Sequence, residues 1–206
     1  MRVCHIFAGG EISDTSFIRI NDGEKIICAD GGLRYVQELG LNPDIVVGDF
    51  DSYKGELPES SVIMRSVPEK DDTDTLLAVK AAISDGAEQI RIYGALGGRF
   101  DHTFANVQTL KYAAEHGCRA SLEDSDNIVM LQEKGERRYN RLDGWYFAFF
   151  AYSEQLKVKR LSGVKYPLEE AVIRNNFPIG VSNEFSEPEA LLDIEEGTAL
   201  IVLSKK

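Results

Sequence analysis

Short apolar runs recur along the first 125 residues, and stretches with helical spacing separate them. This alternation is typical of a parallel sheet whose strands are connected by helices. The runs are apolar on both faces, as strands covered by helices on each side should be. Apolar positions at helical spacing predict three helices that end near Gly40, Gly86 and Gly117. The predicted strands are 3–8, 25–29, 44–48, 61–65, 89–93 and 119–123.

The pattern changes after about residue 125. Helical periodicity fades, and short alternating segments follow one another, separated by turns such as Asp143-Gly144 and Ser162-Gly163. The predicted fold class is therefore α/β: a Rossmann-like three-layer domain with a mostly parallel sheet over 1–125, followed by a small antiparallel β domain, sandwich-like or barrel-like, over 126–206. Its predicted strands are 146–152, 155–161, 171–175, 190–194 and 198–204.

Composition and charge exclude several classes of protein. A net charge of −11 argues against a non-specific nucleic-acid binder, since phosphate backbones are held by clustered Lys and Arg. The three cysteines form no CxxC pair, which indicates neither a zinc site nor a disulfide framework. The apolar stretch after Met1 is too short for a signal peptide, and no run is long enough to span a membrane. We expect a cytoplasmic protein.

Glycines and aspartates gather directly after the predicted strands. Because the carboxyl ends of parallel strands meet at one edge of a sheet, these clusters should surround one ligand site. A GxxxxGK[ST] loop is absent, so a P-loop enzyme is excluded. The clusters are Gly9-Gly10, Asp30-Gly31-Gly32, Gly48–Ser52, Lys70–Asp74 and Gly94–His102.

The aspartates in these clusters predict a magnesium site. Asp49 and Asp51 point to the same side of an extended segment, with Cα atoms about 7 Å apart. Asp71, Asp72 and Asp74 bring further carboxylates to the same edge. So many anions repel one another unless a cation neutralises them, and hard oxygen ligands favour Mg²⁺. The predicted metal ligands are Asp49, Asp51, Asp71 and Asp74.

The glycines predict a phosphate-binding partner for this metal. Backbone N–H groups that precede a helix attract anions, and Arg99 adds a positive charge beside them. Simple capping of a helix is the alternative for Asp101 and for Asp72 or Thr73. For His102 a structural role is the alternative. The predicted nucleotide-binding residues are Gly9, Gly10, Asp30, Gly31, Gly32, Gly97, Gly98, Arg99 and His102.

The ordered motifs resemble those of the thiamine pyrophosphokinases. The resemblance is carried by residues 29–32, 43–44, 48–52, 72–74 and 96–102, and in the tail by 166–168 and 177–185. It implies a magnesium-dependent homodimer that moves the pyrophosphoryl group of ATP to thiamine and releases AMP. Lys70 departs from the pattern, because some members carry an uncharged amide there. By resemblance, Asp49, Asp51 and Asp74 are metal-binding and catalytic acids, Asp30 and Asp101 shape the nucleotide site, and Ser182 and Asn183 bind thiamine.

Three alternatives stay open at this point. A carboxylate, either Asp74 or Asp101, accepts the proton of the substrate hydroxyl or only orients the hydroxyl. Asp101 is therefore also a predicted catalytic residue. A magnesium-dependent phosphohydrolase would use the same carboxylates, and a nucleotide-binding regulatory module would have no turnover. In the β domain, Tyr166, Phe177 and Phe185 are either core residues or walls of the thiamine site.

Overall fold

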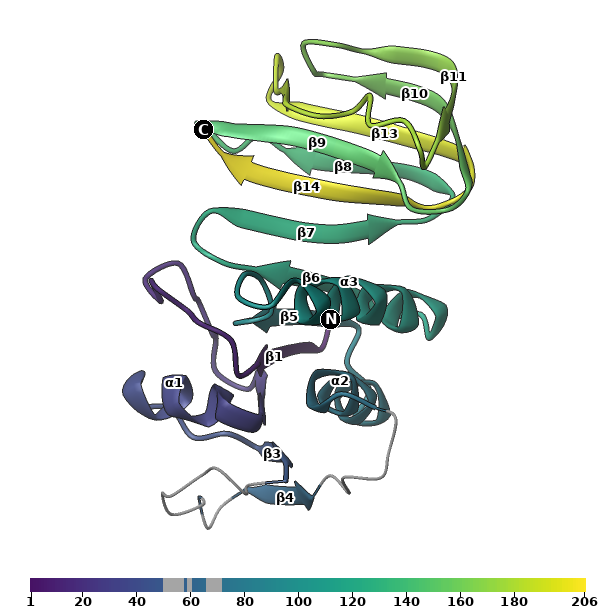
Figure 1. The fold of residues 1–206 in the computed structure, drawn as a ribbon. Coiled ribbons are helices and arrows are strands. Elements are labelled where there is room, and N and C mark those ends of the chain that lie inside the picture. The colour runs from purple at the N-terminus through teal and green to yellow at the C-terminus, as the bar shows by residue number, and fades with distance from the viewer. Residues whose placement is uncertain (50–57, 59–60, 66–71) are drawn as a thin grey trace. The chain divides into compact units, whose positions relative to one another are not determined.

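The chain folds into two compact units. The computed structural model describes residues 1–49, 58, 61–65 and 72–206. Unit 1 comprises Met1–Ser125 and unit 2 comprises Asp126–Lys206 (Figure 1). Among the described residues, no helix has the length and apolar character needed to cross a bilayer.

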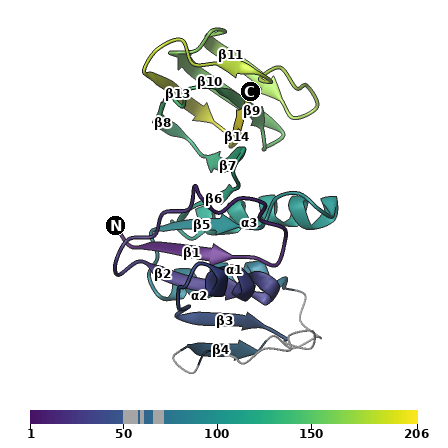
Figure 2. The ribbon, with the colours of Figure 1, turned by 90° about the vertical axis from the view of Figure 1, so that its left-hand side faces the viewer.

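The described residues of unit 1 form six parallel strands in the order β6-β5-β1-β2-β3-β4 (Figure 2). The chain moves outward from β1 to β4 and then returns to place β5 on the other side of β1. The strand order therefore reverses between β1 and β5, which is where open α/β sheets bind their ligands. The bounds are β1 Val3–Phe7, β2 Lys25–Ala29, β3 Ile45–Gly48, β4 Val62–Arg65, β5 Gln89–Tyr93 and β6 Arg119–Glu123.

In the part of unit 1 that the structure describes, the helices are α1 (Leu33–Glu38), α2 (Asp74–Ser84) and α3 (Phe100–Glu115). A short 3-10 turn, η1 (Asp30–Gly32), leads into α1. Leu33 and Val36 of α1 pack in a core cluster with Phe7 and Cys28 on one face of the sheet. Helix α2 contacts β1, β2 and β3, and α3 contacts β6. The predicted α/β class is confirmed.

The sequence predicts that the strand over 61–65 is covered on both faces, and the structure of β4 differs. Val62 and Met64 are exposed, and among the described residues β4 pairs only with β3, at the edge of the sheet. An edge strand has only one neighbour, so its apolar side chains need not be covered. Apolar sequence alone does not separate an edge strand from a central one.

A polar network extends from the buried His5 and Tyr93 to the surface of unit 1. His5 of β1 donates from Nε2 to the carboxylate of Glu24 at 2.9 Å and accepts at Nδ1 from the Tyr93 hydroxyl at 3.0 Å. The carboxylate can only accept, so these partners fix the tautomer of the ring. Burial lowers the pKa of His5. Partial burial acts to raise the pKa of Glu24, but hydrogen bonds from Asn21 and His5 lower it to about 2.

Unit 2 is a sandwich of two antiparallel sheets. One has the order β12-β9-β14-β7 and the other β11-β10-β13-β8. The prediction of a small antiparallel domain is confirmed. The predicted strands do not include β7, β8 or β12, which the structure contains. The strands are β7 Asn127–Gln132, β8 Gly135–Asn140, β9 Trp145–Ala151, β10 Gln155–Ser162, β11 Leu168–Arg174, β12 Asn183–Glu184, β13 Glu189–Glu196 and β14 Ala199–Lys205.

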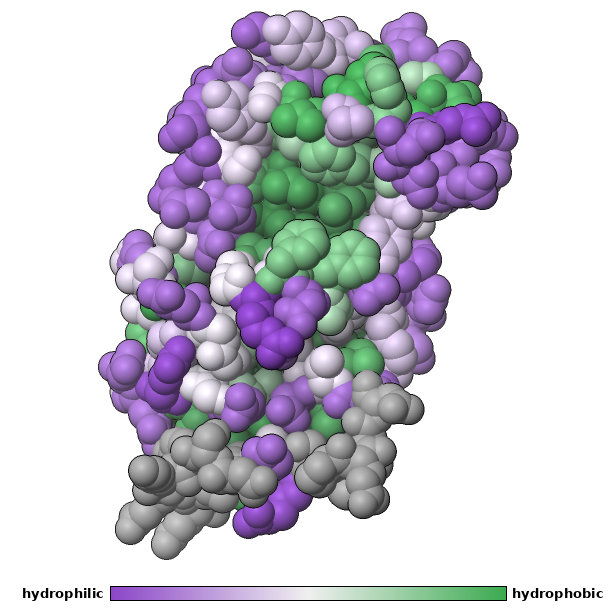
Figure 3. Space-filling model, in the orientation of Figure 1, coloured by the Kyte–Doolittle hydropathy of each residue, from purple (hydrophilic) through white to green (hydrophobic). Residues whose placement is uncertain are grey.

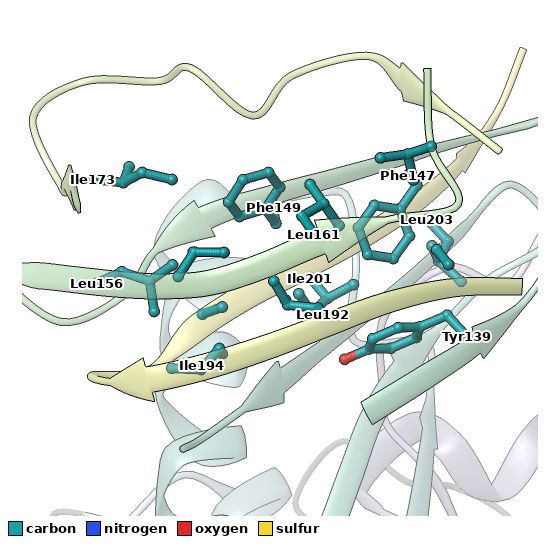
Figure 4. Packing of buried hydrophobic residues seen from close by; sticks show 14 of the residues in the cluster. Tyr139, Phe147, Phe149, Leu156, Leu161, Ile173, Leu192, Ile194, Ile201 and Leu203 are labelled. Carbon is teal, nitrogen blue, oxygen red and sulfur yellow. The ribbon is translucent and has the colours of Figure 1, made fainter. Parts of the chain in front are cut away.

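The core of unit 2 lies between its two sheets. Phe147 and Phe149 of β9 point toward Leu161 of β10 and Leu192 of β13 (Figure 4). All four side chains are fully buried. Alternate residues along each strand thus face the opposite sheet, as the two-residue period of a sandwich strand requires.

Candidate functional site

A pocket of about 690 Å³ lies at the carboxyl ends of the parallel strands of unit 1. Its walls come from the segments that follow β1, β2, β3 and β5 and from the starts of α2 and α3. Strands β1 and β5 flank the reversal of strand order, so the pocket occupies the position expected for a ligand in this architecture.

The loop after β1 is held against the segment after β5. The amide of Gly10 donates to the carbonyl oxygen of Gly94 at 3.0 Å, and a Cβ on Gly10 would overlap that same oxygen. From α1, the hydroxyl of Tyr35 donates to the carbonyl oxygen of Gly10 at 3.0 Å and accepts from the amide of Ile12 at 2.8 Å. The loop that lines the pocket is therefore fixed from two sides.

The turn after β2 brings Asp30 to the pocket. Asp30 adopts a φ of 48°, a left-handed conformation that aspartate tolerates better than most residues. Gly31 and Gly32 do not line the pocket. Gly32 is needed for packing, because a Cβ there would overlap the carbonyl oxygen of Phe7. Of these two glycines, Gly32 is thus required by the packing of the turn that follows Asp30.

Three further aspartates line the pocket beyond β3 and at the start of α2. They are Asp49, Asp72 and Asp74. Asp72 forms an ion pair of 2.6 Å with Lys80, which lies farther along α2. Thr73 caps α2 by accepting from the amide of Leu76 at 3.2 Å, so the capping alternative holds for Thr73.

An ion pair on the first turn of α3 forms another wall. The Arg99 side chain donates to both carboxylate oxygens of Asp101, at 3.1 and 2.6 Å. These hydrogen bonds lower the pKa of Asp101, which therefore stays ionised at neutral pH. Arg99, not Asp101, occupies the N-cap position of α3. Asp101 is therefore not the N-cap residue, although its Oδ1 also accepts from the first-turn amide of His102 at 3.0 Å.

The lining of the pocket is rich in carboxylate oxygens, the type of donor that a hard divalent cation prefers. Five aspartates and a single arginine of the described residues line the pocket. A phosphate-bearing ligand would meet strong repulsion there unless a cation accompanied it. In the described part of the chain, no group of three or more His, Cys, Asp or Glu is placed to hold a metal. Asp51 and Asp71, both predicted ligands, lie outside the described residues.

The two residues predicted to bind thiamine lie in unit 2 and differ in their surroundings. Asn183 is buried, and its side chain is hydrogen bonded to both backbone groups of Tyr166: Oδ1 accepts from the amide at 3.0 Å and Nδ2 donates to the carbonyl at 2.9 Å. Ser182 is exposed, with a φ of 56°. Asn183 is thus placed to position the segment, whereas Ser182 is accessible to a ligand.

Comparison with known families covers most of both units. Residues 19–122 match the family described as "Thiamin pyrophosphokinase, catalytic domain", and residues 132–198 match "Thiamin pyrophosphokinase, vitamin B1 binding domain". The chain belongs to the thiamine pyrophosphokinase family. It is therefore a transferase, as the motif resemblance implies.

Individual members of the family agree in sequence and in fold. The thiamine pyrophosphokinase of Bacillus subtilis (strain 168) is 28% identical over 186 residues, which covers 86% of each chain. The crystal structure of thiamine pyrophosphokinase from Bacillus subtilis has a TM-score of 0.91 at 26% identity, with all of both chains covered. A thiamin pyrophosphokinase family protein from Enterococcus faecalis has a TM-score of 0.87 at 29% identity, again over all of both chains.

The pocket brings together most of the residues predicted for the nucleotide and the metal. Gly31 and Gly32 lie behind its wall, and Asp51 and Asp71 fall outside the described residues. Their roles stay predictions. The predicted residues that line it are Gly9, Gly10, Asp30, Asp49, Asp74, Gly97, Gly98, Arg99, Asp101 and His102.

Two residues, one lining the pocket and one supporting its wall, are absent from the sequence prediction. Asn106 lines the pocket although it lies within α3, well past its first turn. Tyr35 holds the loop after β1 from α1. A polar residue inside an otherwise amphipathic helix is a weak signal for Asn106. No signal in the sequence distinguishes Tyr35 from an ordinary core aromatic residue.

Proposed function

We propose that the pocket of unit 1 binds ATP and that the protein transfers its pyrophosphoryl group to the hydroxyethyl oxygen of thiamine. The products are thiamine diphosphate and AMP. The observation that carries this proposal is the meeting, in one pocket, of motif residues spread from Gly9 to His102. The match of residues 132–198 to the vitamin B1 binding domain supports the binding of thiamine as the acceptor.

In this proposal Asp49 and Asp74 hold Mg²⁺, together with the predicted ligands Asp51 and Asp71. The first two line the pocket, and their carboxylate oxygens are the donors that Mg²⁺ prefers. A Mg²⁺ ion held by these carboxylates would neutralise part of the negative charge of the triphosphate. The excess of carboxylates over basic groups in the wall supports this assignment.

The residues of the chain then have separate roles in the transfer. The thiamine hydroxyl oxygen forms a bond to the β-phosphorus, and the bond from that phosphorus to the oxygen shared with the α-phosphate breaks. AMP leaves with the shared oxygen, and the hydroxyl proton passes to Asp74 or Asp101. The Arg99 ion pair holds the Asp101 carboxylate beside the pocket and lowers its pKa, which makes it a weaker base and favours orienting the hydroxyl over accepting its proton.

We further propose that thiamine is held by the segment of unit 2 that contains Ser182 and that two copies of the chain form a dimer. Hydrophobic side chains gather on the face of unit 2 seen in Figure 3. Phe177, Ile179 and Val181 are more than half exposed in the monomer, which supports a partner or ligand over this segment. The free, buried cysteines Cys4, Cys28 and Cys118 support a reducing cytoplasmic location.

One assay tests the function against its alternatives. The protein is incubated with ATP, Mg²⁺ and thiamine, and AMP, ADP and thiamine phosphates are measured. We expect AMP and thiamine diphosphate in equal amounts, with neither formed when thiamine or Mg²⁺ is left out. Hydrolysis of ATP without thiamine would support the phosphohydrolase alternative. Formation of ADP with thiamine monophosphate would show transfer of a single phosphoryl group and refute the proposal.

A further inference from the structure

Asn106 is a nearly buried polar residue in the wall of the unit 1 pocket. Its exposed fraction is 8%, and it lies on the face of α3 turned to the segment after β5. Its Nδ2 donates a hydrogen bond of 2.8 Å to the backbone carbonyl of Ala95, which also lines the pocket. This bond ties α3 to the carboxyl end of β5.

The bond to Ala95 also fixes which way the amide of Asn106 points. A backbone carbonyl only accepts, so the atom that faces it must be the nitrogen. The oxygen Oδ1 is then the free end of the side chain, and no hydrogen bond to it is present among the described residues. Arg91 Nε is the one fully buried side-chain N or O atom without a partner in that part of the chain. The Oδ1 of Asn106 is therefore accessible, and the space it borders is the pocket.

A ligand that fills the pocket excludes water from this amide oxygen, and an acceptor that is then buried without a partner costs free energy, so the bound ligand should supply a hydrogen-bond donor. Phosphate oxygens at neutral pH are themselves acceptors and cannot supply it. The nucleoside part of a nucleotide offers an exocyclic amino group and ribose hydroxyls. Alanine side chains form part of the same wall and leave room for a flat, apolar ring. These alanines are Ala8, Ala29, Ala95 and Ala105.

We propose that Asn106 is a specificity-determining residue whose Oδ1 accepts a hydrogen bond from the amino group or a hydroxyl group of the nucleoside. The proposal rests on the proposed function, in that the pocket is taken to bind ATP. It assigns Asn106 a contact with the part of the nucleotide that does not react. Sites that hydrogen-bond a substrate N–H or O–H reject analogues that lack it.

The test compares four nucleotides in two proteins. The dissociation constants of ATP, inosine triphosphate, 2′-deoxy-ATP and 3′-deoxy-ATP are measured with Mg²⁺ for the wild type and for Asn106→Leu, which keeps a similar volume. We expect the wild type to bind one analogue about tenfold more weakly than ATP. The analogue that is disfavoured identifies the donor as the amino group or as one of the hydroxyls. In Asn106→Leu, ATP should bind as weakly as that analogue, so the selectivity disappears.

Asn106→Asp serves as the second variant, because it keeps an oxygen acceptor but loses the donor to Ala95. It should retain the ratio between the dissociation constants of ATP and of the disfavoured analogue. Its negative charge should weaken the binding of all four nucleotides. Equal weakening of all four in Asn106→Leu, with an unchanged ratio, would show that Asn106 only supports the wall through Ala95. A wild type that binds all four equally would also overturn the proposal. A wild type that binds none would instead refute the proposed function.

Discussion

The hydroxyl oxygen of Tyr35 and the carbonyl oxygen of Gly10 lie 3.0 Å apart, so α1 directly restrains the loop that follows β1. The same hydroxyl accepts from the amide of Ile12 at 2.8 Å and from the guanidinium of Arg34 at 2.7 Å. Gly10 lines the pocket, whereas Tyr35 does not. Tyr35 is thus a positioning residue for the proposed nucleotide site.

Tyr35→Phe should weaken ATP binding while leaving the fold intact. The change removes three hydrogen bonds and leaves the Ile12 amide without its partner, and we expect unfolding free energy to fall by about 1–3 kcal/mol. The KM for ATP should rise several-fold with a smaller change in kcat, because the loop loses its fixed position. The control is Tyr112→Phe, since the Tyr112 hydroxyl has no hydrogen bond among the described residues. Unchanged ATP kinetics in Tyr35→Phe would limit the residue to a role in stability.

Asp49→Asn should abolish most turnover with little loss of stability. Asp49 lines the pocket as a proposed Mg²⁺ ligand, and charge stabilisation at such a site contributes about 10²–10³-fold in rate. The measurement is kcat over a wide range of Mg²⁺ concentrations. The matched control is Asp85→Asn, because Asp85 is the C-cap of α2 and the pocket is lined by the start of that helix. Near-normal activity of Asp49→Asn at every Mg²⁺ concentration would remove Asp49 from the metal site.

Two adjacent glycines should respond differently to alanine. In Gly32→Ala the new Cβ would overlap the carbonyl oxygen of Phe7, so the turn must shift, and we expect a loss of about 1–3 kcal/mol. In Gly31→Ala the nearest atom to the Cβ is the Cα of Gly9 at 3.6 Å, an ordinary contact. Thermal unfolding of the two variants measures the difference. Equal melting temperatures would mean that the turn adapts freely and that Gly32 has no packing role.

Glu24→Gln should make the protein less stable at pH 7 and change its sensitivity to acid. The carboxylate accepts hydrogen bonds from His5 and Asn21, so we expect a loss of about 1–3 kcal/mol. The folded-state pKa of Glu24 is about 2, below its ordinary value of 4.5. Its contribution is therefore complete above pH 4.5 and is lost as the pH falls toward 2.

The difference in unfolding free energy between wild type and Glu24→Gln should accordingly shrink over that range. Urea denaturation at pH 7, 5, 4 and 3 measures it. The control is Glu38→Gln, an exposed glutamate near the end of α1. A difference that stays constant down to pH 3 would show that Glu24 keeps an ordinary pKa.

Asn183→Ala should weaken thiamine binding without affecting ATP. Its side chain makes two hydrogen bonds with the backbone of Tyr166 and a third with the amide of Glu184, so its loss should disturb the segment that includes Ser182. The lining of the nucleotide pocket belongs to unit 1, which is why ATP affinity should not change. Calorimetric titration of each ligand measures both effects.

Ser182→Ala provides the comparison for a direct contact. It should weaken thiamine binding with no loss of stability, because Ser182 is exposed. Equal losses for both ligands in Asn183→Ala would mean that the residue supports the fold as a whole and not the acceptor site.

The strands and helices of unit 1 could be predicted because each carries its own pattern. Central strands such as β1 and β5 are short apolar runs, and glycines mark the ends of the helices. Strand β8 could not, because its sequence Gly135–Asn140 is mostly charged and polar on its exposed face, with Tyr139 as its only buried residue. Its place depends on pairing with β13, which is distant in sequence.

The candidate site was predictable to the extent that its residues lie beside strand ends. Asp49 and Arg99 belong to clusters of glycine and aspartate that a regular core segment would not contain. Asn106 and Tyr35 lie inside helices, and their roles depend on contacts with Ala95 and Gly10. Such contacts arise from tertiary packing, which spacing along the chain does not encode.

The pocket wall is assembled from segments that extend from Ala8 to Asn106, so no short stretch of the chain carries the whole site. A nucleotide consequently has nothing to recognise in the unfolded chain, and its binding energy adds in full to the stability of the folded state. At a ligand concentration one hundred times its dissociation constant, that addition is about 2.7 kcal/mol. The resistance of unit 1 to heat and proteolysis in a cell would therefore follow the supply of its own substrate.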